Sequence, residues 1–439
     1  MSPIAVALLG FVAMLLLIGI RMPVGLAMLL TGSAGYVYFT SWNTFLSYMN
    51  STPYHLFSSY TLSVIPLFIL MGAIAERSGL STKLFRSAAS LVGHARGGMA
   101  MALIGACTAF GAICGSSVAT TATFGRATLP EFERYRYSKS FATGTIAVGG
   151  TLGILIPPSI ILVVYAITTE QNIAKLFKAA LIPGLLAAAF YCVVIAIIAR
   201  RNPEAAPIHQ KASRQEQVST LLSIWPVLLV AFVVVGGIYG GVFTPTEGAS
   251  VGVIAMLLIA LTQRGFGWAE LKESIIQTAE TSAMIFAIIL GSEVFDAFLA
   301  LSQLPSQSAE FVTGLGLPAF GVMTALLLFY ILLGAVMDEL AMILLTLPVF
   351  FPIVAGLDFG LPPEETAIWF GILVLIVVGI GLTCPPIGLN VFVVSSIARG
   401  VPITSIYRGV LPFVAADIVR LLLVMIFPVL ALWLVRVLP

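Results

Sequence analysis

The chain has 439 residues, of which 59% are hydrophobic and only 9% are Asp, Glu, Lys or Arg, and its mean hydropathy is +1.09. Soluble proteins carry roughly 25% charged residues, so this composition excludes a large soluble enzyme and a disordered or fibrous chain. The net charge is only +2 and no segment forms a basic domain, which argues against a nucleic-acid partner. A polytopic membrane protein in a lipid bilayer remains, and its long apolar segments predict helices rather than barrel strands.

Ten apolar segments have the length of a membrane crossing. The first is followed, not preceded, by the positive charge of Arg21, so we interpret it as a retained span rather than a signal peptide. The sequence therefore predicts an all-α membrane protein. In chain order the segments lie near residues 4–20, 23–40, 60–76, 140–169, 180–199, 221–243, 248–263, 274–300, 367–398 and 413–435.

Two further apolar stretches, 98–130 and 317–354, are interrupted at their centres by small polar residues. If both enter and leave the membrane by the same face, and the N-terminus is outside, most Lys and Arg residues fall on the inner side. If either stretch crossed fully, every later loop would change sides and this bias would collapse. The charges therefore predict two re-entrant helical hairpins. The predicted outer loops 41–59, 244–247, 301–316 and 355–366 then contain no Lys or Arg.

The two halves of the chain resemble each other weakly. GILIPPSIILVV at 153–164 matches GLTCPPIGLNVFVV at 381–394, and LFKAALIP at 176–183 matches IYRGVLP at 406–412. Each half would hold five crossings and one hairpin, and because five is odd the second copy enters the membrane inverted. We place the first repeat at 1–200, a cytoplasmic linker at 201–217 and the second repeat at 218–439.

Two proline pairs interrupt predicted crossings, at 140–169 and 367–398. Proline has no N–H, so Pro157-Pro158 and Pro385-Pro386 each leave carbonyl groups without a helical donor. Unpaired backbone groups cost several kcal/mol each in lipid and are tolerated where a neighbour or an ion uses them. We interpret both segments as unwound helices that can bind a cation; a simple proline kink is the alternative.

Polar residues also mark the two hairpin tips. The first tip is a hydroxyl-rich cluster that suits a carboxylate at a helix N-terminus, with small-residue helix packing as the alternative. It consists of Gly115, Ser116, Ser117, Thr120, Thr121 and Thr123. At the second tip lies Asp338, which aligns with Gly115 of the first tip. Its charge in the bilayer costs about 2.5 kcal/mol or more unless it is compensated. Either a sodium ion or a proton would compensate it.

Further charged residues lie in apolar stretches. Glu339 lies beside Asp338, and a position facing the outer water is the alternative for it. Arg126 in the first hairpin either holds the carboxylate of an anionic substrate or extends to the inner surface. Asp417 and Arg420, three residues apart on the last span, are interpreted as a structural ion pair. Because the sequence contains no H-E-x-x-H, G-x-S-x-G or P-loop motif, we expect no enzyme activity and no ATP hydrolysis. Transport would then depend on an ion gradient.

Three motifs together resemble the large membrane subunit of tripartite ATP-independent periplasmic (TRAP) transporters, over about residues 23–430. They are GSSVATTATFG, LGILIPPSIILVVYAITTE with LFKAALIPG, and FGILVLIVVGIGLTCPPIGLNVFVVSSIA. The resemblance implies an elevator of the ion-transporter superfamily in the bacterial inner membrane. Ten crossings that start from an outer N-terminus place both termini in the periplasm. It implies sodium-driven import of an organic acid, such as a C4-dicarboxylate or a sialic acid.

The resemblance also implies partners: a small four-helix membrane subunit and a soluble periplasmic substrate-binding protein. A stand-alone sodium- or proton-coupled carboxylate carrier of the same fold is the alternative. Two or more transported Na⁺ ions would bind between each hairpin tip and the unwound helix of the same half, with no organic cofactor.

The site residues carried over from the resemblance fall into three sets. Relatives often have an acidic residue where this chain has Gly379, so charge compensation at the second sodium site falls on Asp338. The first sodium site would use Ser116, Ser117, Gly153, Ile156 and Pro158, and the second Asp338, Gly379, Gly381 and Thr383. The organic acid would contact Gly115, Ser116, Ser117, Thr120, Arg126, Pro157, Pro385, Pro386 and Asn390.

Overall fold

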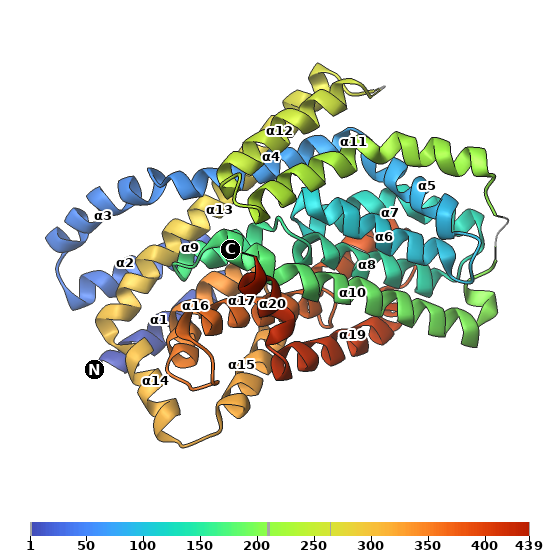
Figure 1. Cartoon of the computed structure of the whole chain (residues 1–439). Coiled ribbons are helices and arrows are strands. Elements are labelled where there is room, and N and C mark those ends of the chain that lie inside the picture. The colour runs from blue at the N-terminus through green and yellow to red at the C-terminus, as the bar shows by residue number, and fades with distance from the viewer. Residues whose placement is uncertain (1, 209–210, 264, 439) are drawn as a thin grey trace.

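The computed structural model describes residues 2–208, 211–263 and 265–438, and all regular structure within these ranges is helical (Figure 1). The first half of the chain contains α1 (Pro3–Gly19), α2 (Val24–Phe39), α3 (Trp42–Phe57), η1 (Tyr60–Ser63), α4 (Val64–Arg77), α5 (Leu80–Val92), α6 (Gly98–Cys114), α7 (Ser117–Arg134), α8 (Lys139–Leu155), α9 (Ile160–Thr168) and α10 (Ile173–Arg201). The second half contains η2 (Pro203–Ala205), α11 (Arg214–Tyr239), α12 (Pro245–Leu261), α13 (Trp268–Ser302), α14 (Leu304–Gly314), α15 (Ala319–Gly334), α16 (Glu339–Ala355), α17 (Pro363–Gly381), α18 (Leu389–Ile397), α19 (Ile403–Ile426) and α20 (Val429–Val437).

The apolar helices confirm a polytopic membrane fold. Six helical segments are long and apolar enough to cross a bilayer, and a seventh is formed if α8 and α9, which meet at 45°, are counted as one bent span. The other three predicted crossings correspond to α1, α2 and α12, which have 16 or 17 residues. Two predicted outer loops, 41–59 and 301–316, contain the helices α3 and α14, which the sequence analysis missed.

The order of elements repeats along the chain. The hairpin α6–α7, the broken pair α8–α9 and α10 recur as α15–α16, α17–α18 and α19. In Figure 1 the first hairpin lies at the right and the second at the lower left, so the two approach the centre from opposite sides. The equivalent helices α8 and α17 form the core, because every residue from Phe141 to Leu155 and from Thr366 to Gly381 is buried.

The two halves are intertwined through helices far apart in sequence. In Figure 1, α13 runs beside α2. A Cβ built on Gly25 would lie 2.7 Å from the Ala287 carbonyl oxygen, so here the two backbones touch. Helices α4 and α12 also pack against each other, and a Cβ on Gly252 would lie 2.5 Å from the side-chain sulfur of Met71. These four helices form a continuous wall beside the hairpins.

A buried polar network joins α8, α10 and α19. Arg420 Nη2 lies 2.8 Å from Asp417 Oδ1, and both side chains are almost completely buried, which confirms the expected ion pair. The Tyr191 hydroxyl donates to Asp417 Oδ2 at 2.7 Å and lies 3.1 Å from the Thr151 hydroxyl. The pair is thus supported by hydrogen bonds, as a buried charge requires.

Candidate functional site at the hairpin tips

The first hairpin turns at Gly115 and Ser116. Gly115 has φ +64°, a conformation that glycine adopts without strain, and the Ser116 hydroxyl caps α7 by accepting the Ala119 N–H at 3.4 Å. A Cβ on Gly115 would lie 2.9 Å from the Pro158 carbonyl oxygen, and one on Gly153 would lie 2.5 Å from the Ser116 carbonyl oxygen. The tip therefore lies directly against the break between α8 and α9.

The break between α8 and α9 leaves main-chain carbonyl oxygens without helical hydrogen-bond donors. In a continuous helix the carbonyls of Gly153 and Ile154 would accept N–H groups from residues 157 and 158, but both are prolines. The peptide bond between these prolines is cis. Carbonyl oxygens that lack a helical donor therefore lie next to the first tip.

The second hairpin turns between Gly334 and Glu339. Asp338 caps α16, since its Oδ1 accepts the N–H groups of Leu340 at 3.1 Å and Ala341 at 3.0 Å. The alignment of the halves had paired Asp338 with Gly115, but as the capping residue Asp338 corresponds to Ser116. The predicted carboxylate is thus partly used within its own helix.

The second tip contacts the break between α17 and α18. The Ile387 N–H donates to the Ala335 carbonyl at 3.1 Å, and the peptide bond of Pro385-Pro386 is cis. The helix α17 extends through Gly379 and Gly381, so these two candidate ligands lie in its last turn and the unwound segment begins after them. The Thr383 hydroxyl donates to the Ile380 carbonyl at 3.0 Å, in the same region.

The two tips meet at a central cavity of about 520 Å³. The side opposite the tips is formed by α4 and α13, while α9 and α18 contribute their first residues. Three of the lining side chains are carboxylates, and none of the described lining residues is basic. The lining comprises Glu76, Gly115, Ser116, Val118, Ala119, Ala122, Ile160, Ile161, Gln277, Thr281, Met284, Ile285, Ile288, Asp338, Glu339, Leu340 and Leu389.

Of the predicted site residues, Gly115, Ser116 and Asp338 line this cavity. Ser117 and Asn390 lie behind the tip instead, where Asn390 Nδ2 donates to the Ser117 hydroxyl at 2.7 Å and to the Ala147 carbonyl at 3.0 Å. This amide joins α18 of the second half to the first hairpin. The rest of the predicted set, apart from Arg126, lies in or beside the two breaks and not on the cavity wall: Thr120, Gly153, Ile156, Pro157, Pro158, Gly379, Gly381, Thr383, Pro385 and Pro386.

Arg126 lies outside the central cavity. It belongs to α7, its side chain is 63% exposed, and its Nη2 lies 3.0 Å from Glu76 Oε1. Both sequence interpretations missed this partner, because Glu76 is 50 residues away on another helix.

Four polar residues of the cavity were not recognised as site residues: Glu76, Gln277, Thr281 and Glu339. The sequence places Glu339 beside Asp338 in an apolar stretch, with a position facing the outer water as the alternative. Its Oε2 is inaccessible to solvent and has no hydrogen-bond partner among the described residues. The signal for Gln277 and Thr281 is weaker, since both lie on a helix whose facing neighbour cannot be read from the sequence.

Comparisons with known proteins agree with this architecture. A family model described as the DctM component of tripartite ATP-independent periplasmic transporters matches residues 11–430. The C4-dicarboxylate TRAP transporter large permease of Pseudomonas aeruginosa is 37% identical, over 85% of this chain and 86% of its own. The sialic acid TRAP transporter large permease of Vibrio cholerae is 30% identical, over 84% and 85%. The solved YdaH transporter of Alcanivorax borkumensis superposes with a TM-score of 0.60 at 16% identity, covering 90% of this chain and 89% of its own, and supports the fold alone.

Proposed function

Because the chain belongs to the family of TRAP transporter large permeases, which are multi-pass inner-membrane proteins and not enzymes, we propose that it imports an organic acid with sodium by an elevator movement. The candidate substrates are a C4-dicarboxylate, a sialic acid or a similar carboxylate, in keeping with the names of its relatives. A periplasmic binding protein would deliver the substrate, and a small four-helix membrane subunit would support the permease. Both termini would lie in the periplasm.

The meeting of the two hairpin tips in one cavity is the observation that carries this proposal. Helix N-termini attract anions, and both α7 and α16 begin at the cavity. An organic acid that enters the cavity therefore meets two helix N-termini from opposite sides, as expected of a substrate site between repeats. The apolar residues of α13 would contact its carbon skeleton.

Sodium would bind where each tip meets its break. Hydroxyl and main-chain carbonyl oxygens are the ligands that sodium takes in transporters with unwound helices. The first site would combine Ser116 and Ser117 with Gly153, Ile156 and Pro158, at the break where the Gly153 carbonyl lacks a helical donor. The second would combine the carboxylate of Asp338 with the last turn of α17 and Thr383. Sodium there would also compensate the acidic charge of the cavity.

The elevator would move the hairpins and broken helices against the wall formed by α2, α4, α12 and α13. The cavity lies at this boundary, since its tips come from one group and α4 and α13 from the other. A movement along the boundary would carry the tips and the substrate together and leave the wall in place. The substrate held between the tips would thus become accessible from the other side of the membrane.

Uptake into proteoliposomes tests the proposal. The permease is reconstituted with its small subunit, and a radiolabelled organic acid is supplied with or without the binding protein and an inward sodium gradient. We expect accumulation only when both are present. Uptake without the binding protein would support the stand-alone carrier. Uptake driven equally well by a proton gradient would exclude sodium as the specific coupling ion. The acid is first identified by a thermal-shift screen of the binding protein.

A further inference from the structure

A second cavity, of about 400 Å³, lies between the C-terminal end of α4, the start of α5 and the hairpin helix α7. It adjoins the central cavity, because Glu76 lines both. We call it the inner cavity, since the charge distribution places the end of α4 on the cytoplasmic side. Its lining comprises Glu76, Arg77, Gly79, Ser81, Thr82, Thr123, Arg126 and Ala127.

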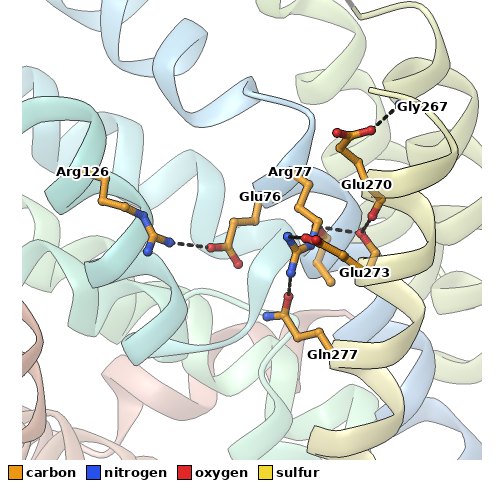
Figure 2. Close-up of polar contacts among 9 residues, drawn as sticks. Glu76, Arg77, Arg126, Gly267, Glu270, Glu273 and Gln277 are labelled. Atoms are coloured by element: carbon orange, nitrogen blue, oxygen red, sulfur yellow. Dashed lines mark hydrogen bonds and ion pairs between the residues drawn. The ribbon is translucent and has the colours of Figure 1, made fainter. Parts of the chain in front are cut away.

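The two arginines of the inner cavity have different surroundings (Figure 2). Arg77 is held on α13, with Nη1 at 2.5 Å from Glu273 Oε2 and Nη2 at 3.0 Å from Gln277 Oε1. Arg126 reaches from α7 to α4 and contacts one oxygen of Glu76 through a single nitrogen. Its exposed guanidinium carries further N–H groups that a second carboxylate can reach.

The rest of the inner cavity also offers hydrogen-bond donors. The helix α5 starts after Gly79, which has no side chain to cap it, so the N–H groups of Ser81 and Thr82 in the first turn lack a capping acceptor. An independent observation is the hydroxyl of Thr123. It belongs to a residue that is 6% exposed, and it has no hydrogen-bond partner among the described residues. A guanidinium, an unpaired hydroxyl and a helix N-terminus together match a carboxylate group.

We propose that the inner cavity is a second carboxylate-binding site, in which the carboxylate replaces Glu76 as the partner of Arg126. The side chain of Glu76 is then an internal competitor that occupies the guanidinium when the site is empty. If the proposed import is correct, this is where the organic acid binds on its way from the central cavity to the cytoplasm. That role rests on the proposed function, whereas carboxylate binding itself does not.

Protection of a single introduced thiol tests the site. Ala127→Cys places a thiol on the cavity lining, in a chain where the two partly exposed cysteines, Cys192 and Cys384, are changed to Ser. Labelling by the neutral reagent N-ethylmaleimide is followed in acetate, the carboxylate group common to organic acids, against chloride at the same ionic strength. We expect acetate to slow labelling here and not at Thr262→Cys, an exposed control at the end of α12.

Two further changes separate a binding site from a structural ion pair. Arg126→Gln removes the guanidinium and is expected to abolish protection, while Arg126→Lys retains part of it. Glu76→Gln removes the competitor and is expected to lower the half-protecting acetate concentration roughly two- to fivefold, since partly exposed ion pairs are weak. If both Gln variants weaken protection equally, or if acetate never protects, the proposal is wrong.

This assay uses purified protein without a sodium gradient, a binding protein or a transported substrate. A failure of uptake therefore does not decide its outcome, and a failure of protection leaves the proposed import intact. Folding of each variant is checked by gel filtration in detergent. Arg126 is mostly exposed, so its substitution is expected to leave the fold unchanged.

Discussion

The two hairpin tips share a backbone design and differ in chemistry. Each begins a helix at the central cavity and each touches a break that contains a cis Pro-Pro pair. The first tip is capped by the neutral hydroxyl of Ser116, and the second by the carboxylate of Asp338, with Glu339 beside it. The repeat thus preserved the position of the capping group while its charge changed.

This difference predicts unequal tasks for the two halves. A sodium ion at the first tip would add a positive charge to a neutral site, which favours an anionic substrate nearby. The charge of a sodium ion at the second tip would be compensated by the carboxylate of Asp338. Substitutions that exchange or remove the capping groups test whether the asymmetry is functional.

The largest effect is expected from Asp338→Asn. Asn caps helices as well as Asp, so the fold should be retained while the charge is lost. We expect the half-maximal sodium concentration for uptake to rise at least about tenfold, which corresponds to roughly 1.4 kcal/mol. Sodium titration of uptake in proteoliposomes measures this, with Asp358→Asn, at an exposed carboxylate outside both proposed sodium sites, as the control. An unchanged sodium dependence would exclude Asp338 from the site.

The next effect, on stability rather than on transport, is expected from Gly153→Ala. Gly379 is the comparison, because it lies two residues before the last residue of α17, as Gly153 does in α8, although the sequence repeat pairs Gly153 with Gly381. A Cβ on Gly153 would lie 2.4 Å from the Thr120 hydroxyl, whereas one on Gly379 finds its nearest neighbour, the Thr151 Cβ, at 3.8 Å. Overpacking should destabilise Gly153→Ala by about 1–3 kcal/mol and spare Gly379→Ala, as measured by thermal unfolding in detergent. Equal stability of the two variants would contradict the close contact at the first tip.

The smallest effect is expected from loss of the caps themselves. Ser116→Ala removes one long bond of 3.4 Å, while Asp338→Ala removes two of 3.1 and 3.0 Å. Loss of an N-cap typically costs about 1 kcal/mol, so Asp338→Ala should lower the unfolding temperature more than Ser116→Ala. The reverse order would show that the Ser116 cap contributes more to stability than the length of its hydrogen bond indicates.

Much of the fold was predictable because lipid imposes strict rules on the chain. Helices are observed at the predicted crossings and as a pair at each predicted hairpin, positions that follow from apolar length and from charge bias. The re-entry of each pair on one face of the membrane stays a prediction. The helices α3 and α14 were missed, since their polar residues resemble those of loops. The alignment of Asp338 was wrong by one position, because the repeat is too divergent to fix a tip to a single residue.

Site residues were predictable only where a single segment of the sequence contains the signal. Ser116 and Asp338 stand out as polar residues in apolar stretches, and both reach the central cavity. Glu76, Gln277 and Thr281 reach it through packing between distant helices, which no local pattern reveals. The ion pair of Arg126 with Glu76 could not be predicted for the same reason, since its two residues lie on helices that are distant in sequence.

The intertwined helices have a consequence for biogenesis. The glycine face of α2 packs against α13, whose residues are synthesised more than 200 positions later. Until α13 leaves the ribosome and inserts, Gly25 has no backbone to contact and the early helices remain open to lipid. Truncation of the gene after the linker should therefore yield a fragment that membrane proteases degrade, and co-expression of the missing fragment should rescue it.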